Sequence, residues 1–233
     1  MEVSRVLLIG DQLEILRTLR RNLSGRGYEV TLALDDRDAV DVAARERIDL
    51  YVILLDFTID VDGLTVCKRI RAQSQAPIIV LSTIGAEQTK IRALDLGADD
   101  YLEMPFSMEE FLARVRSALR RWVAHKHSSD STPDRRLITS GKLLIDCDSH
   151  QVLCDGDEIH LTPTEFRLLE YLAHNQGKVI SHRKILQEVW GAEYGDEREY
   201  LRVYISQLRH KIESEPMNPE HILTEPGVGY RFS

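Results

Sequence analysis

The chain has 233 residues, of which 43% are hydrophobic and 29% charged, and a formal net charge of -8 at pH 7. This length allows two ordinary domains, and no apolar run comes near the ~18 residues that a membrane span requires. Because phosphate affinity needs clustered Lys and Arg, the acidic balance argues against nucleic-acid binding over the whole surface. Any contact with DNA must therefore be local.

The first residues enter a strand pattern directly and contain no secretory leader. The three cysteines, Cys67, Cys147 and Cys154, fit no metal-binding spacing and leave an odd count. This usage is typical of reduced thiols rather than of a disulfide framework. We therefore expect a cytoplasmic protein without membrane contact, in which Cys67 packs in a core.

The first half of the chain alternates short apolar runs with amphipathic stretches. The runs predict strands at 5–9, 28–34, 50–56, 77–82 and 100–104, and the stretches predict helices at 13–23, 38–46, 64–71, 90–97 and 109–122. This alternation predicts an α/β doubly wound parallel sheet of five strands, with right-handed crossovers. Neither G-x-G-x-x-G nor G-x-x-x-x-G-K-[ST] occurs, which argues against dinucleotide or P-loop nucleotide binding.

A polar, Ser-rich stretch with Pro133 follows, VAHKHSSDSTPDRR, and its composition is typical of a linker. We therefore place a first domain at 1–122, the linker at 123–136 and a second domain at 137–233.

The second domain begins with strand-like pieces at 142–146, 151–154 and 158–161, and Asp155-Gly156 is a hairpin signature. Helices are expected at 162–177, 181–191 and 196–213, the first with a capping box of Thr162 and Glu165 and the second with Ser181 as N-cap. A terminal hairpin is expected over 221–233. Three helices followed by a hairpin indicate a winged helix-turn-helix α+β domain.

The third of these helices has two distinct faces. A buried stripe is predicted at i, i+4, i+7 and i+11, formed by Leu201, Ile205, Leu208 and Ile212. The outer face then holds Arg198, Arg202, Ser206 and Arg209, which suits a recognition helix in the major groove. The alternative is a surface helix with scattered charge, since Glu197 and Glu199 are also present.

The motifs LTPTEFRLLEYL, Trp190-Gly191 and GVGYRF, together with the receiver-like first half, resemble the OmpR/PhoB family of response regulators, and most closely its KdpE-type members. The resemblance implies a flavodoxin-like receiver joined to a DNA-binding domain. It implies a two-component transcription regulator rather than an enzyme, with double-stranded DNA, a sensor histidine kinase and RNA polymerase as partners. It also implies DNA contacts from Trp190, Thr224, Gly229 and Tyr230, while Pro226 occupies the wing position that often carries a minor-groove Arg.

In that family, acidic residues after the first strand and an Asp ending the third strand hold Mg²⁺, and the third-strand Asp accepts a phosphoryl group. By resemblance, Asp11 and Asp56 are the metal-ligand candidates, Asp56 is the phosphoacceptor candidate, and Ser82 and Tyr101 match the hydroxyl and aromatic positions. The chain departs from the family at two positions, because Gly10 replaces an acid and Met104 replaces the Lys that pairs with the phosphoryl group.

The spacing around the acceptor is also irregular, since counting back from Gly63 places Leu55 at the acceptor position. A slip of one residue would turn Asp56 to the other face of its strand unless a bulge corrects it. Losing a carboxylate weakens Mg²⁺ binding, and losing the Lys removes a stabilising cation. We therefore expect a degenerate receiver that works without conventional phosphorylation. The alternative is conventional phosphorylation of Asp56 by a sensor histidine kinase, with compensating contacts from Asp60 or Asp62.

Charged residues follow one another at helical spacing near the end of the receiver, where the resemblance implies cross-subunit ion pairs in a two-fold dimer. They are Lys90, Asp95, Asp99, Asp100, Glu110, Arg114, Arg116 and Arg121. The alternative is an ordinary solvated charged face.

Overall fold

The computed structural model describes residues 3–55, 63–83, 87–127 and 137–233. The chain divides into two compact units, Met1–Val123 and Ala124–Ser233. No helix among the described residues is long and apolar enough to cross a membrane.

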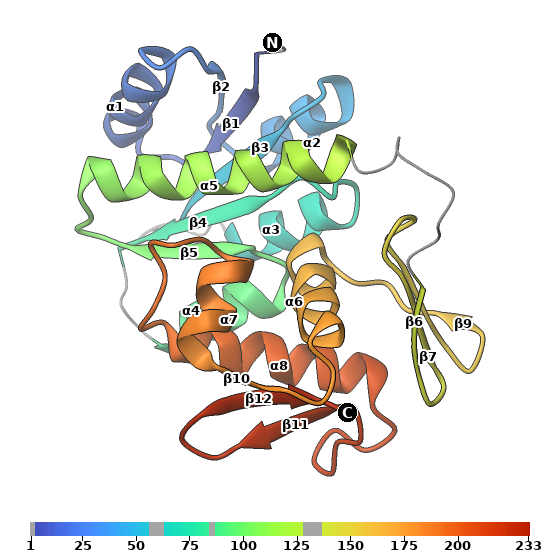
Figure 1. The fold of residues 1–233 in the computed structure, drawn as a ribbon. Helices are drawn as coiled ribbons and strands as arrows, with labels where there is room; N and C mark the ends of the chain where they lie inside the picture. Colours follow the sequence, from blue (N-terminus) through green and yellow to red (C-terminus); the bar gives the residue numbers. More distant parts are fainter. Residues whose placement is uncertain (1–2, 56–62, 84–86, 128–136) are drawn as a thin grey trace. The chain divides into compact units, whose positions relative to one another are not determined.

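The first unit is built on a parallel sheet in the order β2-β1-β3-β4-β5 (Figure 1). Its strands are β1 Arg5–Ile9, β2 Glu29–Ala33, β3 Leu50–Leu55, β4 Ile78–Ser82 and β5 Asp100–Glu103. Every residue of β3 and β4 is buried, as expected of strands covered on both faces. The predicted doubly wound parallel fold is confirmed.

Helices cover both faces of this sheet, namely α1 Leu13–Ser24, α2 Asp36–Arg45, α3 Gly63–Arg71, α4 Glu87–Asp95 and α5 Met108–His127. Apolar side chains of α1 and α5 form one core with alternate residues of β1 and β3, including Leu8, Val52 and Leu54. The intervening residues of β3 face α3, because a Cβ at Gly63 would meet the side chains of Leu55 and Ile53. Cys67 is fully buried, as predicted.

The division of the chain falls at the predicted start of the linker, but the first residues of that linker are helical, because α5 continues through His127. Residues 123–127 contain neither Gly nor Pro, and adding residues to an existing helix costs little compared with starting one. Residues 128–136 of the predicted linker lie outside the described part of the chain.

From residue 137 onward, the second unit combines two antiparallel sheets with three helices. One sheet has the order β6-β7-β8-β9, with β6 Leu137–Ser140, β7 Leu143–Asp146, β8 Gln151–Cys154 and β9 Asp157–Glu158. The other has the order β10-β12-β11, with β10 Val179–Ser181, β11 Ile222–Glu225 and β12 Gly229–Phe232. The helices are α6 Pro163–His174, α7 His182–Val189 and α8 Arg198–Ile212, and they pack against one another. The winged helix-turn-helix class is confirmed.

Local signals in this unit are largely confirmed. The capping box forms, since the Glu165 amide donates to Thr162 Oγ1 and the Thr162 amide donates to Glu165 Oε2. Asp155 and Gly156 both adopt positive φ, as their hairpin turn requires. The strand predicted at 158–161 is wrong, because β9 ends at Glu158, and the short strand β10 was not predicted.

Candidate functional site

At the carboxyl end of β1, where the family resemblance would place the first acidic residue, there is no free space for a side chain. Gly10 is buried, its amide donates to Ala33 O, and a Cβ added to it would lie 2.9 Å from Leu54 Cβ. A side chain at position 10 would therefore require Leu54 or the backbone beside it to shift. Of the two acidic positions there, only the partly exposed Asp11 remains, and one carboxylate is a poor match for the several oxygen ligands that Mg²⁺ takes.

Met104, at the position of the family's Lys, lies just after β5. Its amide donates to Ser82 O at 2.8 Å, and its side chain packs partly buried against the core formed with α1 and α5. An apolar thioether replaces the ammonium group here, so position 104 provides no positive charge to the carboxyl end of the sheet.

Ser82 and Tyr101 are brought together, as the two adjacent parallel strands β4 and β5 predict. Ser82 is fully buried and Tyr101 is 4% exposed, and their side chains share a hydrogen bond. The ring is turned inward, and its burial raises the pKa of the Tyr101 phenol. The Ser82 side chain already has a protein partner.

The phosphoacceptor candidate Asp56, with Asp60 and Asp62, lies outside the described residues. The residue before it is placed: Leu55 ends β3 opposite Ser82 and is 3% exposed. Its Cδ2 occupies the space that a Cβ at Gly63 would take, at 2.2 Å. Leu55 therefore contributes an apolar contact between β3 and the start of α3.

Two residues predicted for the dimer surface are instead buried and paired within the receiver, which corrects the prediction. Asp99 accepts from Arg71 Nη2 at 2.5 Å and from the Ile78 amide at 2.9 Å. Asp100 accepts from Arg114 Nη1 at 3.0 Å, and Arg114 also donates to Glu110. Both aspartates follow the end of α4 and face inward, which sequence spacing alone did not reveal.

The other predicted members of this surface are more accessible. Asp95, Glu110 and Arg116 are exposed, Lys90 is partly exposed, and Arg121 donates to Ser117 Oγ on its own helix. They lie on α4 and α5.

The recognition face predicted on α8 divides into an open part and a part that holds the terminal hairpin. Arg198, Arg202 and Ser206 are exposed, and Arg202 Nη1 lies 2.6 Å from Glu199 Oε1. The opposite stripe of Leu201, Ile205, Leu208 and Ile212 is buried, as predicted.

Arg209 departs from the prediction because its guanidinium is turned against the hairpin. It donates to Ile222 O, with the shorter contact at 2.6 Å, and to Thr224 Oγ1 at 2.8 Å. It also lies over the ring of Tyr230, which is 5% exposed. Arg209 thus joins α8 to β11 and β12 rather than standing free for a base.

Two residues expected to contact DNA are structural. Trp190 is fully buried and packs edge-on against Tyr204, so its indole cannot reach a phosphate. Gly229 is buried in β12, where a Cβ would lie 1.8 Å from Ile180 O. Their resemblance-based roles are corrected to packing of α7 on α8 and of β12 on β10.

Sequence reasoning missed His182, the first residue of α7. Its ring packs edge-on against Tyr230 at 5.5 Å between centroids. Burial, followed by the charges of Arg198 and Arg202, lowers its pKa, so this imidazole is neutral among the arginines at neutral pH. The exposed Arg183 and Lys184 follow it, and the sequence Ser-His-Arg-Lys at a helix start was the available signal.

Family profiles match both units of the chain. The profile described as "Response regulator receiver domain" matches residues 6–116, and that described as "Transcriptional regulatory protein, C terminal" matches residues 156–232.

Full-length relatives and solved structures agree with these matches. The chain is 44% identical to the transcriptional regulatory protein KdpE of Mycobacterium tuberculosis over 97% of this chain and 98% of the relative. It is 41% identical to KdpE of Escherichia coli strain K12 over 99% of each. Among structures, it is similar to a C128S mutant of RitR, with a TM-score of 0.76, 26% identity and 99% of both chains covered. It is also similar to the Thermotoga maritima OmpR/PhoB homolog DrrB, with a TM-score of 0.50, 27% identity and full coverage of both.

Proposed function

Because the chain belongs to the OmpR/PhoB family of two-component response regulators, we propose that it regulates transcription through sequence-specific DNA binding with a receiver that does not depend on conventional phosphorylation of Asp56. The observation that carries the proposal is the lack of free space for an acidic side chain at the end of β1, where Leu54 packs beside Gly10. The proposed role is regulatory rather than enzymatic, in the cytoplasm, with RNA polymerase as the partner at the promoter and a sensor kinase as the upstream partner.

Charge at the receiver site supports this proposal. Phosphoryl transfer to a carboxylate depends on positioning and on neutralising oxygen charge. Gly10 supplies no side-chain ligand for a cation, and Met104 supplies no positive charge. Both changes disfavour the phosphorylated state, so the usual driving force for activation is weakened.

The contact between Ser82 and Tyr101 also supports a receiver that works without conventional phosphorylation. In the family, the hydroxyl residue is part of the phosphorylation site, and the aromatic side chain turns inward on activation. Here the two side chains share a hydrogen bond, and both are buried. The receiver accordingly rests in an arrangement with the aromatic turned inward. The competing possibility is that Asp60 or Asp62 restores phosphorylation of Asp56.

We propose further that two receivers associate through α4 and α5, using Lys90, Asp95, Glu110 and Arg116. These side chains carry both signs of charge, which suits a two-fold interface where the same patch pairs with itself. Sedimentation velocity of the untreated chain at micromolar concentration is expected to show a dimer that weakens as salt rises. A monomer at every concentration would contradict this proposal.

DNA recognition is proposed to depend on the exposed part of α8, with Arg198, Arg202 and Ser206 in the major groove. Arg209 of α8 and the hairpin residues Thr224 and Tyr230 support this face. Since the second unit is acidic overall, this local basic face must supply the affinity. The domains are proposed at 1–122 and 137–233, joined by a linker at 123–136, and the division of the chain into compact units after Val123 supports the first boundary.

Replacing Arg202 by alanine is expected to weaken binding to the cognate promoter fragment by about 1–3 kcal/mol. The exposed guanidinium can give up its ion pair with Glu199 and bind a base edge or a phosphate instead. A mobility-shift titration measures it. The matched control is Lys142→Ala, which also removes one exposed positive charge but lies in the turn between β6 and β7, beside Asp155. Equal affinities for the Arg202 variant, the control and the native chain would show that the recognition face is misplaced.

A further inference from the structure

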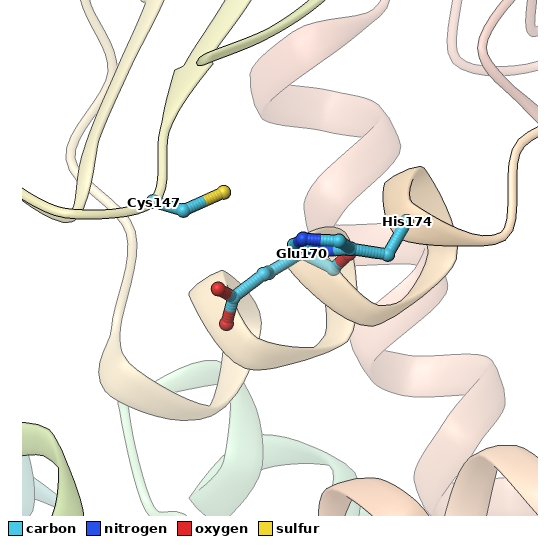
Figure 2. Close-up of side chains that lie close together, drawn as sticks. All are labelled: Cys147, Glu170 and His174. Carbon is cyan, nitrogen blue, oxygen red and sulfur yellow. The ribbon is translucent and has the colours of Figure 1, made fainter. Parts of the chain in front are cut away.

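Three side chains with different donor atoms meet where the turn after β7 approaches α6. Cys147 lies in that turn, and Glu170 and His174 extend from successive turns of α6 toward it (Figure 2). One donor atom from each, the thiol sulfur, a carboxylate oxygen and an imidazole nitrogen, all lie within 4.8 Å of one another. Among the described residues, this group alone brings together three potential metal ligands.

We propose that Cys147, Glu170 and His174 bind a divalent cation of the zinc type. Sulfur and nitrogen donors favour zinc over the oxygen-seeking Mg²⁺ and Ca²⁺. Three protein ligands with a fourth position open to water form a familiar zinc set. Tetrahedral zinc needs its donors roughly 3.5 Å apart, so the Glu170 and His174 side chains must close by about 1 Å.

The local structure prepares two of the ligands. Asp146 Oδ1 accepts from the amides of Asp148 and Ser149, both at 3.0 Å, which fixes the turn on either side of Cys147. The Nδ1 of His174 lies 2.9 Å from Glu170 O. If Nδ1 carries the proton, it donates to that carbonyl and leaves the Nε2 lone pair for a metal, which is the usual arrangement of a coordinating histidine.

Accessibility differs among the three ligands in a way that suits metal entry. Cys147 is 6% exposed, whereas His174 is exposed and Glu170 is partly so. An open cavity of about 290 Å³ is lined by both α6 ligands together with Arg167, Tyr171, Glu188 and Val189. A cation could enter from that side and keep a water as its fourth ligand.

Binding would tie the four-stranded sheet to α6. Burial, reinforced by the nearby Glu170 carboxylate, raises the pKa of the Cys147 thiol to about 12. Forming the metal–sulfur bond therefore breaks the S–H bond and releases one proton to solvent, with no change in oxidation state. Because the ion would bind the folded unit and not the unfolded chain, it would also raise the temperature of unfolding.

The test uses Co²⁺ as a spectroscopic probe on the full chain under reducing conditions. The native protein is expected to bind one Co²⁺ per chain with a sulfur-to-cobalt charge-transfer band, which Zn²⁺ then abolishes by displacement. Cys147→Ser is expected to lose the band, and Cys154→Ser, the matched control on the neighbouring strand, to keep it. His174→Ala changes an exposed side chain and is expected to weaken Co²⁺ binding at least tenfold.

Circular dichroism and tryptophan fluorescence of the metal-free variants establish that each is folded. A band that survives in Cys147→Ser, that disappears in Cys154→Ser, or that is unaffected in strength and affinity by His174→Ala would overturn the proposal. So would the absence of any band in the native chain with Co²⁺ in millimolar excess. None of these outcomes depends on DNA binding or on the receiver.

Discussion

Replacing Gly229 by alanine is expected to destabilise the DNA-binding unit by more than about 4 kcal/mol, a size that only a few mechanisms produce. The added Cβ would lie 1.8 Å from Ile180 O, 2.8 Å from Ile180 C and 2.9 Å from Ser181 Cα. All three are backbone atoms, so no side chain can rotate away. Relief requires β10 to separate from β12, and β10 leads directly into the N-cap of α7.

Fluorescence of Trp190 during urea unfolding measures this effect in a Trp122→Phe background, because these are the chain's two tryptophans. The control is Gly227→Ala, where φ is +74° and no atom lies within 4 Å of the added Cβ. That change is expected to cost only about 1–2 kcal/mol of left-handed backbone strain. Equal losses for the two variants would contradict the steric explanation.

Asp99→Ala is expected to lower the free energy of unfolding of the receiver by about 3–5 kcal/mol, because it leaves the Arg71 guanidinium buried without its anion. The two side chains are 11% and 5% exposed, and they form the ion pair at 2.5 Å. Arg71 also donates to the carbonyls of Gly97, Ser74 and Ala76, so it cannot turn out to solvent without losing these bonds.

Trp122 provides the reporter for this receiver variant, since its indole donates to Asp49 Oδ1 at 3.2 Å, and the measurement is made in a Trp190→Phe background. The control is Asp41→Ala on α2, an exposed position where the loss is expected to stay below about 1 kcal/mol. An Asp99 variant as stable as this control would mean that the buried ion pair is not formed.

The spacing of hydrophobic residues predicted most of the fold, because this spacing reflects which side of each helix or strand is buried. Continuous apolar runs identified β3 and β4, and spacing of 3.6 residues identified the buried stripe of α8. Short elements escaped: β10 has three residues, and its pairing with β12 depends on a partner about fifty positions away.

The sites were less predictable because side-chain partners are chosen in three dimensions. Arg209 was predicted on the same outer face of α8 as Arg202. In the folded unit, however, its guanidinium donates to Ile222 O of the terminal hairpin. The sequence predicts Asp99 as a surface charge, whereas in the structure it accepts a hydrogen bond from Arg71 at the end of α3. Likewise, Cys147 lacks a metal-binding spacing in the sequence, and only the packing of α6 brings Glu170 and His174 beside it.

Intact-mass measurement after incubation with a small phosphodonor and Mg²⁺ tests the central claim, a receiver independent of conventional phosphorylation, most directly. We expect the native chain to keep its mass, because Gly10 and Met104 supply neither the second acid nor the cation of the phosphorylation site. A stoichiometric phosphorylated species that disappears in Asp56→Asn would contradict the claim and establish the conventional switch.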